Sequence, residues 1–199
     1  MLGEGEVSIR IRGPREVHIQ ETIFAGVWRV QEHDEAGRVV RDRLMACPIP
    51  GLVTQAAREA ASPRLRTVAV PPGAMNSPAL LREIQQQVSA RRNGAPAHVV
   101  NLTLLPLTPE DHRVLDEAME PGPVGIMSRG FGSCRVSSTS ARDVWRVQYF
   151  NSMQTLILNT LEVVEVPEVA LAAPEDLVDS RERLGELVDW MGEACAGGA

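Results

Sequence analysis

The chain has 199 residues, of which 44% are hydrophobic, and a formal net charge of −6 at pH 7. That apolar content is sufficient for a normal core in one domain or in two small ones. The longest apolar runs fall well short of the roughly 20 residues of a membrane helix, and the first residues lack the basic and apolar regions of a signal peptide. We therefore expect a folded, soluble, cytoplasmic protein with no membrane segment.

The negative charge is concentrated near the end of the chain. Residues 162–199 contain ten acidic residues and two arginines, a net charge of −8, which leaves +2 for the other residues. Because the phosphates of nucleic acids attract clustered positive charge, this distribution argues against a nucleic-acid partner. We interpret the acidic segment as a solvated helix face, with a docking surface for a basic partner as the alternative.

The chain begins with alternating apolar and polar residues, which predict β-strands. We expect three strands, in residues 3–13, 18–30 and 37–50, to form an antiparallel meander. The last of them ends in prolines, which cannot donate hydrogen bonds to a sheet. A helix is expected to follow in residues 51–61.

Two helices and a strand are expected next. Residues 77–92 carry an apolar stripe at helical spacing, with Ser77 as the N-cap and a proline at the first helical position. Residues 97–107 read as a buried strand. Residues 108–119 predict a short helix that Thr108 caps, with acidic residues in its first turn, where they favour the helix dipole.

The pattern of the first strands returns in the last third of the chain. Three strands are expected in residues 121–133, 134–150 and 155–167. An amphipathic helix should follow in residues 173–194, and a break near Ser180 is an open alternative.

A repeated pentapeptide explains this return. VWRVQ occupies residues 27–31 and again residues 144–148. When the chain is aligned with itself at this offset of 117 residues, positions 2–57 and 119–174 share 14 identities in 56. Because self-similarity at a fixed period is typical of repeated structural units, we predict an internal duplication.

The expected fold is therefore α+β, with two related antiparallel meanders and flanking helices. Residues 1–60 would form a partial first repeat, a meander plus a helix. Residues 61–199 would form a complete second repeat, in the order helix, strand, helix, meander, C-terminal helix. The two meanders could pack as separate sheets about a pseudo-two-fold axis or pair edge to edge in one longer sheet, and the sequence leaves both open.

Strand alternation assigns the two faces of the VWRVQ segments. Four residues are predicted to point inward as the core of the repeats: Trp28, Val30, Trp145 and Val147. Six residues are candidates for a partner-binding surface: Arg29, Gln31, Arg146, Gln148, Arg129 and Phe131. The alternative for the two strand arginines is an ordinary ion pair with a cross-strand acid.

Side chains that could perform chemistry are sparse. The four histidines share no metal-ligand spacing with one another or with a cysteine, and Cys47, Cys134 and Cys195 fit neither a disulfide framework nor a metal knuckle. No nucleophile motif or cofactor fingerprint is present. We expect no catalytic residue, no cofactor and no resident metal; Cys134, in a glycine-flanked turn, is the weak candidate for a transient metal ligand.

Several stretches resemble one known family. They are LGEGEVSIRI, IQETIFAGVWRV, VNLTLLPLTPEDH, VWRVQYFNSMQTLILNTLEV and VPEVALAAPEDLVDSRERLGEL. Together they cover nearly the whole chain, which is similar to the HupH/HyaF-type hydrogenase expression and formation proteins. Members resemble a tandem of two such units and usually run longer at the N-terminus.

The resemblance implies a cytoplasmic accessory protein, not an enzyme, in the maturation of uptake [NiFe] hydrogenases. Its implied partners are the precursor of the small, iron–sulfur subunit, which it would hold as a chaperone before export, and other hydrogenase accessory proteins. A metal or iron–sulfur carrier that uses Cys134 with Cys47 or a histidine is the second hypothesis, and a small-molecule enzyme is the third. The resemblance assigns no catalytic residues.

Overall fold

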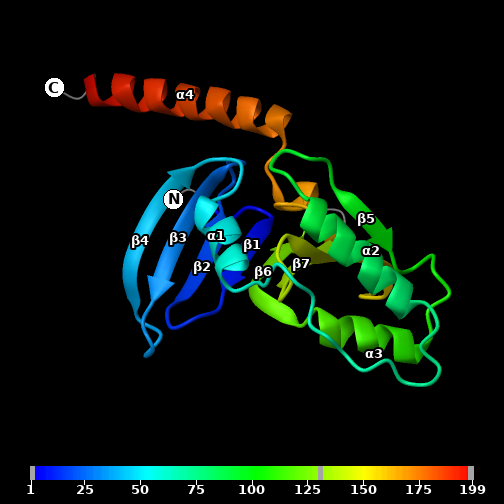
Figure 1. Ribbon diagram of the computed structural model, residues 1–199. Coiled ribbons are helices and arrows are strands. Elements are labelled where there is room, and N and C mark those ends of the chain that lie inside the picture. The colour runs from blue at the N-terminus through cyan, green and yellow to red at the C-terminus, as the bar shows by residue number, and fades with distance from the viewer. Residues whose placement is uncertain (1–2, 130–131, 197–199) are drawn as a thin grey trace.

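A computed structural model gives the structure of residues 3–129 and 132–196 (Figure 1). The strands are β1 (Val7–Ile11), β2 (Glu16–Glu21), β3 (Val27–His33), β4 (Val39–Ala46), β5 (His98–Asn101), β6 (Pro121–Ser128), β7 (Ser133–Thr139), β8 (Val144–Phe150) and β9 (Leu156–Val163). The helices are α1 (Gly51–Glu59), α2 (Ser77–Ala90), α3 (Pro109–Ala118) and α4 (Pro174–Ala196), with a 3₁₀ turn at Glu168–Ala170.

The strands form one antiparallel sheet in the order β4-β3-β2-β1-β6-β7-β8-β9-β5. Each meander has four strands where the sequence predicted three, because the stretches around 18–30 and 134–150 each contain two strands and a tight turn. The β1–β6 ladder joins the two meanders edge to edge. The α+β class is therefore confirmed, and the longer single sheet is the arrangement adopted.

The two meanders have the same pairing register. Ile9 pairs with Ile126 across the centre of the sheet, and these two residues are themselves 117 positions apart. Every ladder of the first meander recurs in the second at this offset, including the irregularity after Glu32, which recurs after Tyr149. A duplication would produce such an agreement, but the duplication itself stays a prediction.

One face of the sheet carries the main core. Trp28, Val30, Trp145 and Val147 are at most 1% exposed. Helix α1 covers this face and contributes Val53 and Ala57 to the same cluster. Each indole also finds a backbone acceptor, since Trp28 Nε1 donates to the Cys47 carbonyl at 2.8 Å and Trp145 Nε1 to the Glu165 carbonyl at 3.2 Å. These bonds satisfy the one polar group that each buried tryptophan has.

The opposite face is covered in the second meander only. There α2 and α3 cover the face, and their side chains, with Val100 of the neighbouring strand β5, surround Leu161, which is fully buried. Leu44 is its counterpart at the offset of 117, and its side chain is 57% exposed. The same residue type at the same place in a meander is therefore core in one half and surface in the other.

Asp111 fixes the two helices that cover the second meander. Its side chain is fully buried, and it accepts hydrogen bonds from the backbone amides of Asn76 and Ser77 at the start of α2 and of Thr108 at the start of α3. Thr108 caps α3 as predicted, in a reciprocal capping box with Asp111. The N-cap of α2 is Asn76, not Ser77: the Asn76 carbonyl accepts the first helical hydrogen bond, from the Leu80 amide, and the Asp111 carboxylate holds the amides of both Asn76 and Ser77.

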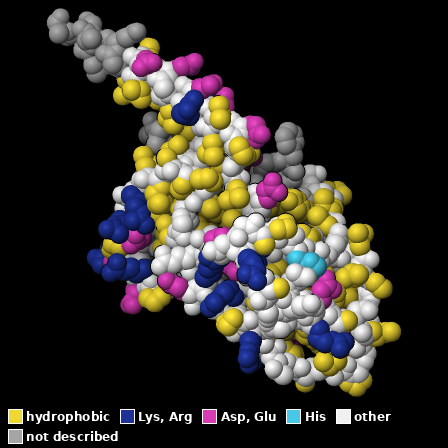
Figure 2. All heavy atoms as spheres, turned by 45° about the horizontal axis from the view of Figure 1, so that its top comes forward, with side chains coloured by type: hydrophobic (Ala, Val, Ile, Leu, Met, Phe, Trp, Pro, Cys, Tyr) yellow, Lys and Arg dark blue, Asp and Glu magenta, His cyan; other side chains and the backbone are white. Residues whose placement is uncertain are grey.

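Helix α4 begins on the body and then leaves it (Figure 1). Leu177 packs near Gly26, the Arg183 guanidinium lies 5.2 Å from the ring centre of Phe24, and Ser180 is buried. The helix runs without interruption from Pro174 to Ala196, so a break near Ser180 is not observed. Figure 2 shows acidic side chains along this projecting helix.

The buried tryptophans give a test of the core. Trp28→Ala and Trp145→Ala should each lower the free energy of unfolding by about 3 to 5 kcal/mol, because each leaves a large cavity under α1. Trp190→Ala is the matched control, since that side chain is 66% exposed on α4. Urea denaturation measures all three, and wild-type stability in either core variant would contradict the inward placement.

Asp111 should also make the protein sensitive to acid. Burial alone would raise the pKa of this carboxyl, but the hydrogen bonds from Ser77 and Thr108 outweigh burial and lower the pKa below its ordinary value of 3.8. A carboxyl whose pKa is lowered by folding stabilises the folded state above pH 3.8, and this contribution is lost as the pH falls below that value.

Asp111→Asn should therefore destabilise the protein at neutral pH by about 1 to 3 kcal/mol, because the amide nitrogen of asparagine cannot accept the Thr108 hydrogen bond. The difference from wild type should shrink below about pH 4. Unfolding curves between pH 7 and pH 3 check this, and a difference that is independent of pH would contradict it.

Candidate binding surfaces

The predicted surface on β3 is built around Arg29. Its guanidinium contacts the Asp42 carboxylate of β4 at 2.6 Å, and Gln31 donates to the same carboxylate at 3.0 Å. The hydrogen bond from Arg29 lowers the pKa of Asp42. The guanidinium is 56% exposed, so this ion pair lies in solvent. Arg29 thus forms the cross-strand ion pair that the sequence analysis gave as the alternative.

Arg146, the counterpart of Arg29, lies in a different environment. Helix α3 extends over it, and its guanidinium contacts Asp116 of that helix at 2.6 Å with 22% of the side chain exposed. Gln148 is half-buried on the same strand. Arg146 and Gln148 are therefore less accessible than Arg29 and Gln31, because α3 extends over Arg146 and the first meander has no corresponding helix among the described residues.

The other two predicted partner-binding residues follow β6. Arg129 is exposed, and its backbone amide donates to the Glu6 carbonyl at 3.1 Å. Phe131 lies outside the described residues. The structure thus does not bring Arg129 together with Arg29.

Strand β4 forms one end of the sheet, and no strand of the described residues pairs with its outer side. Val39, Val40 and Leu44 are between 48% and 57% exposed. On the other face of the strand, Arg41 and Arg43 each lie 3.6 Å from the same Glu32 carboxylate oxygen. One side of the edge thus carries apolar side chains on either side of the Arg29–Asp42 ion pair, and the other side carries Arg41 and Arg43 with Glu32.

The counterpart of this edge in the second meander is occupied. Strand β5 pairs with β9, with His98 opposite Val163 and Asn101 opposite Thr160. At the offset of 117 the equivalent backbone on β4 is residues 43–46, which pairs only with β3. Strand β5 thus shows how an extended segment would lie on β4.

The cysteine predicted as a weak metal ligand is buried. Cys134 is 5% exposed and lies opposite Tyr149 in the β7–β8 ladder. Burial raises the pKa of both the Cys134 and the Cys47 thiols, and burial beside Cys134 raises the pKa of Tyr149 to about 12. Among the side chains that the structure describes, in residues 3–129 and 132–191, no three His, Cys, Asp or Glu are grouped so that they could hold a metal ion.

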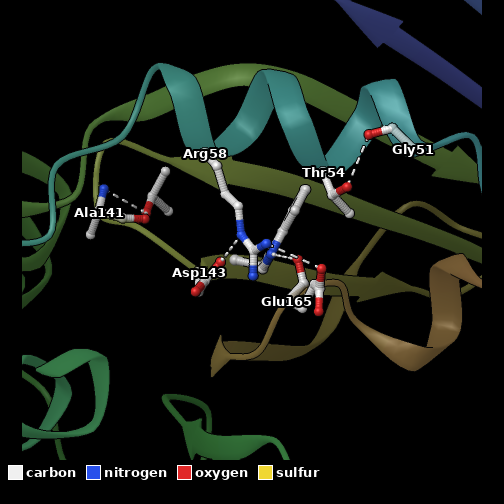
Figure 3. A network of polar contacts seen from close by, with 8 residues as sticks. Gly51, Thr54, Arg58, Ala141, Asp143 and Glu165 are labelled. Carbon is white, nitrogen blue, oxygen red and sulfur yellow. Dashed lines mark hydrogen bonds and ion pairs between the residues drawn. The ribbon is translucent and has the colours of Figure 1, made fainter. Parts of the chain in front are cut away.

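An ion-pair network that the sequence did not indicate connects α1 to the second meander (Figure 3). Arg58 Nε donates to Asp143 at 2.9 Å in the β7–β8 turn, and its Nη1 lies 3.3 Å from the Glu165 carboxylate. Asp143 has φ +58°, the left-handed conformation that aspartate tolerates better than most residues. Since 85 residues separate Arg58 from Asp143, no local pattern could reveal the pair.

Arg58 and Asp143 also form one wall of a cavity of about 780 Å³. The second wall is the segment after α1, and the third is the C-terminal half of α2. Four of the residues that line the cavity are arginines: Arg58, Arg64, Arg91 and Arg142. The sequence showed no arginine cluster because these four residues spread over 85 positions.

In the described part of the chain, no helix is both long and apolar enough to cross a lipid bilayer.

A free strand edge beside an exposed sheet face is typical of proteins that bind extended segments of other chains. Comparison with known proteins identifies the family. The sequence model "HupH hydrogenase expression protein, C-terminal conserved region" matches residues 1–70 and 74–191. The chain belongs to this family of hydrogenase expression proteins.

The chain is similar in sequence to several curated proteins. The chain is 50% identical over 193 residues to hydrogenase expression/formation protein HoxQ of Cupriavidus necator (96% of this chain, 68% of the relative), and 43% identical over 188 residues to HupH of Rhizobium leguminosarum bv. viciae (94% and 66%). It is 38% identical over 198 residues to hydrogenase-1 operon protein HyaF of Escherichia coli (98% and 68%). The chain thus spans about two thirds of the length of the curated relatives it matches.

A solved structure has a similar fold. Hydrogenase expression protein HupH from Thiobacillus denitrificans superposes with a TM-score of 0.52 at 27% sequence identity. The match covers 59% of this chain and 96% of that one.

The Arg58 network yields a prediction about how α1 is attached. Arg58→Gln and Asp143→Asn should show a coupling free energy of about 0.5 to 1 kcal/mol in a double-mutant cycle, because the pair is partly exposed to solvent. Chemical denaturation measures the coupling. Arg82→Gln, on the exposed face of α2, combined with Asp143→Asn is the control cycle and should give none. Equal values in the two cycles would contradict a direct interaction.

Proposed function

We propose that the protein is a non-enzymatic accessory chaperone of [NiFe] hydrogenase maturation. In this proposal it acts in the cytoplasm and binds the immature small, iron–sulfur subunit before export, together with other hydrogenase accessory proteins. Membership of the hydrogenase expression protein family supports the maturation role. The identity of the client and the holding activity are our inference.

The observation that carries the proposal is the unoccupied edge of β4. Backbone groups on the outer side of an edge strand are ready to pair with another extended chain. In the second meander β5 fills this position on β9. The first meander leaves it open beside the exposed side chains of Val40 and Leu44. A client segment in an antiparallel register on residues 43–46 would reproduce the β5–β9 ladder.

The side chains of β4 define the chemistry of the client segment. Its residues on one face would contact Val40 and Leu44 and are expected to be apolar. Its residues on the other face would approach Arg41 and Arg43 and are expected to include acids. An alternating apolar and acidic strand of an incompletely folded subunit meets both requirements, and such a strand is withdrawn when the subunit folds.

The carrier hypothesis receives less support. A thiol binds metal as the thiolate, and burial raises the pKa of both Cys47 and Cys134. Of the groups beside Cys134, Tyr149 is a poor metal ligand while it stays protonated, and the charge of Glu162 raises the pKa of the thiol further. We therefore prefer the chaperone proposal, in which the protein carries no chromophore, to the carrier hypothesis.

We also propose that residues 1–60 and 61–199 are a partial and a complete copy of one duplicated unit. The common register at an offset of 117 residues supports this. The length of the solved relative is consistent with it, since 59% of 199 residues is about 117 and that match covers nearly the whole of the other chain.

Co-purification tests the client. The tagged protein should capture the small-subunit precursor at least about tenfold better than the mature, cluster-loaded subunit, and the eluate should carry no visible absorbance of its own. Capture of neither form, or a coloured protein that elutes alone, would contradict the chaperone proposal and favour a carrier.

Paired variants locate the contact. Val40→Glu with Leu44→Glu should reduce capture of the precursor at least about tenfold, since both side chains flank the open edge. Val99→Glu with Ile157→Glu introduces the same charges at similarly exposed strand positions (51% and 55%) and should leave capture unchanged. Hydrogen exchange gives a second readout, because the outer amides of β4 should become protected by the client. Protection of these amides without a client would show that another part of the protein occupies the edge.

A further inference from the structure

The arginine-lined cavity between α1, α2 and the β7–β8 turn is a second candidate binding site. It shares no residue with the open strand edge. Arg58, Arg64, Arg91 and Arg142 line it, against a single acid, Asp143. Arg58 already neutralises that acid at 2.9 Å. The cavity therefore has a net positive charge.

Three of the four guanidinium groups have no acidic partner. Among the side chains of residues 3–129 and 132–191, no carboxylate lies within 4.0 Å of Arg64, Arg91 or Arg142. Arg91 is also only partly used as a donor. Its Nη1 donates to the carbonyls of Ala95 and Pro96 at 3.0 and 3.3 Å, whereas its buried Nε has no hydrogen-bond partner. A buried N–H without a partner is costly, so a ligand oxygen at this place would be stabilising.

The walls of the cavity are held together by hydrogen bonds. Ser62 accepts from the Arg142 amide and donates its own amide to the Ser140 carbonyl, both at 2.8 Å, and its hydroxyl accepts from the Arg64 amide at 3.1 Å. Gln85 of α2 accepts from the Leu65 amide at 2.8 Å. The backbone positions of Arg64 and Arg142 are thereby fixed relative to each other, which reduces the entropy cost of binding.

The lining also limits the class of ligand. Guanidinium groups bind phosphate and carboxylate oxygens through two parallel hydrogen bonds. The volume is in the usual range for small-molecule sites, about 300 to 1,000 Å³. None of the lining residues is aromatic, so the cavity offers no surface on which a nucleobase could stack. Arg91 is the C-cap residue of α2, so its charge also offsets the partial negative charge of that helix end.

We propose that this cavity binds a compact polyanion through phosphate or carboxylate groups, held mainly by Arg64, Arg91 and Arg142. The inference concerns a separate site and does not depend on the chaperone proposal. A ligand here would bridge α1, α2 and the β7–β8 turn, and would thus stabilise the attachment of the helices to the sheet.

Isothermal titration calorimetry of the full chain with sodium pyrophosphate, at constant ionic strength, tests the proposal. Saturable binding with one site per chain is expected. Arg64→Gln with Arg142→Gln should weaken it at least about tenfold; both side chains are exposed, so the fold should be retained. Arg12→Gln with Arg15→Gln removes the same charge from the exposed β1–β2 turn and should leave the affinity unchanged.

Two further measurements sharpen the outcome. Arg91→Gln should also weaken binding at least about tenfold, with the melting temperature recorded to separate loss of affinity from loss of fold. Citrate in place of pyrophosphate distinguishes the two oxyanions, and tighter binding of either one assigns the ligand class within the proposal. Absence of saturable binding at millimolar concentrations, or equal weakening in the Arg12 and Arg15 control, would overturn it.

Discussion

The antiparallel pairing of β1 with β6 is the contact on which the rest of the structure depends. It joins two four-stranded meanders into one sheet, with Ile9 opposite Ile126 at its centre. Because side chains alternate between the faces of a strand, a slip of one residue in this ladder would turn the inner face of one meander outward. In the observed register Trp28 and Trp145 share one buried face, and α1 covers both halves of it. The Arg58 network then holds α1 to the second half.

Identical residues in the two meanders have different environments. Arg29 and Arg146 occupy the same place in the repeated pentapeptide, yet the first lies in solvent with Asp42 and the second lies under α3 with Asp116. Leu44 and Leu161 differ in the same way. The segment that folds over a strand therefore decides whether its outer face is core or surface. In this protein the helix–strand–helix segment of residues 77–118 covers only the second meander.

This asymmetry also explains which features the sequence could predict. Strand periodicity predicted which side of Trp28 and Trp145 is buried, because period-2 alternation is a local property. It could not predict that Arg146 is covered, because the covering helix begins 37 residues earlier. The N-cap of α2 was wrong for a similar reason, since Asp111, 34 residues after Ser77, holds the amides of Asn76 and Ser77 and the helix starts one residue earlier than its local signals predicted. The arginine-lined cavity joins three distant segments, so no local pattern marked it.

Under the chaperone proposal, the charges beside β4 would favour exchange with a client over a permanent contact. Glu32 contacts both Arg41 and Arg43, each at 3.6 Å, so one carboxylate serves two guanidinium groups. Exposed pairs of this kind contribute little to stability, about 0 to 1 kcal/mol. A client carboxylate could therefore pair with one arginine while Glu32 keeps the other, and neither charge would be buried alone. Release would also cost little free energy, because Glu32 stays beside the arginine and pairs with it again when the client strand leaves.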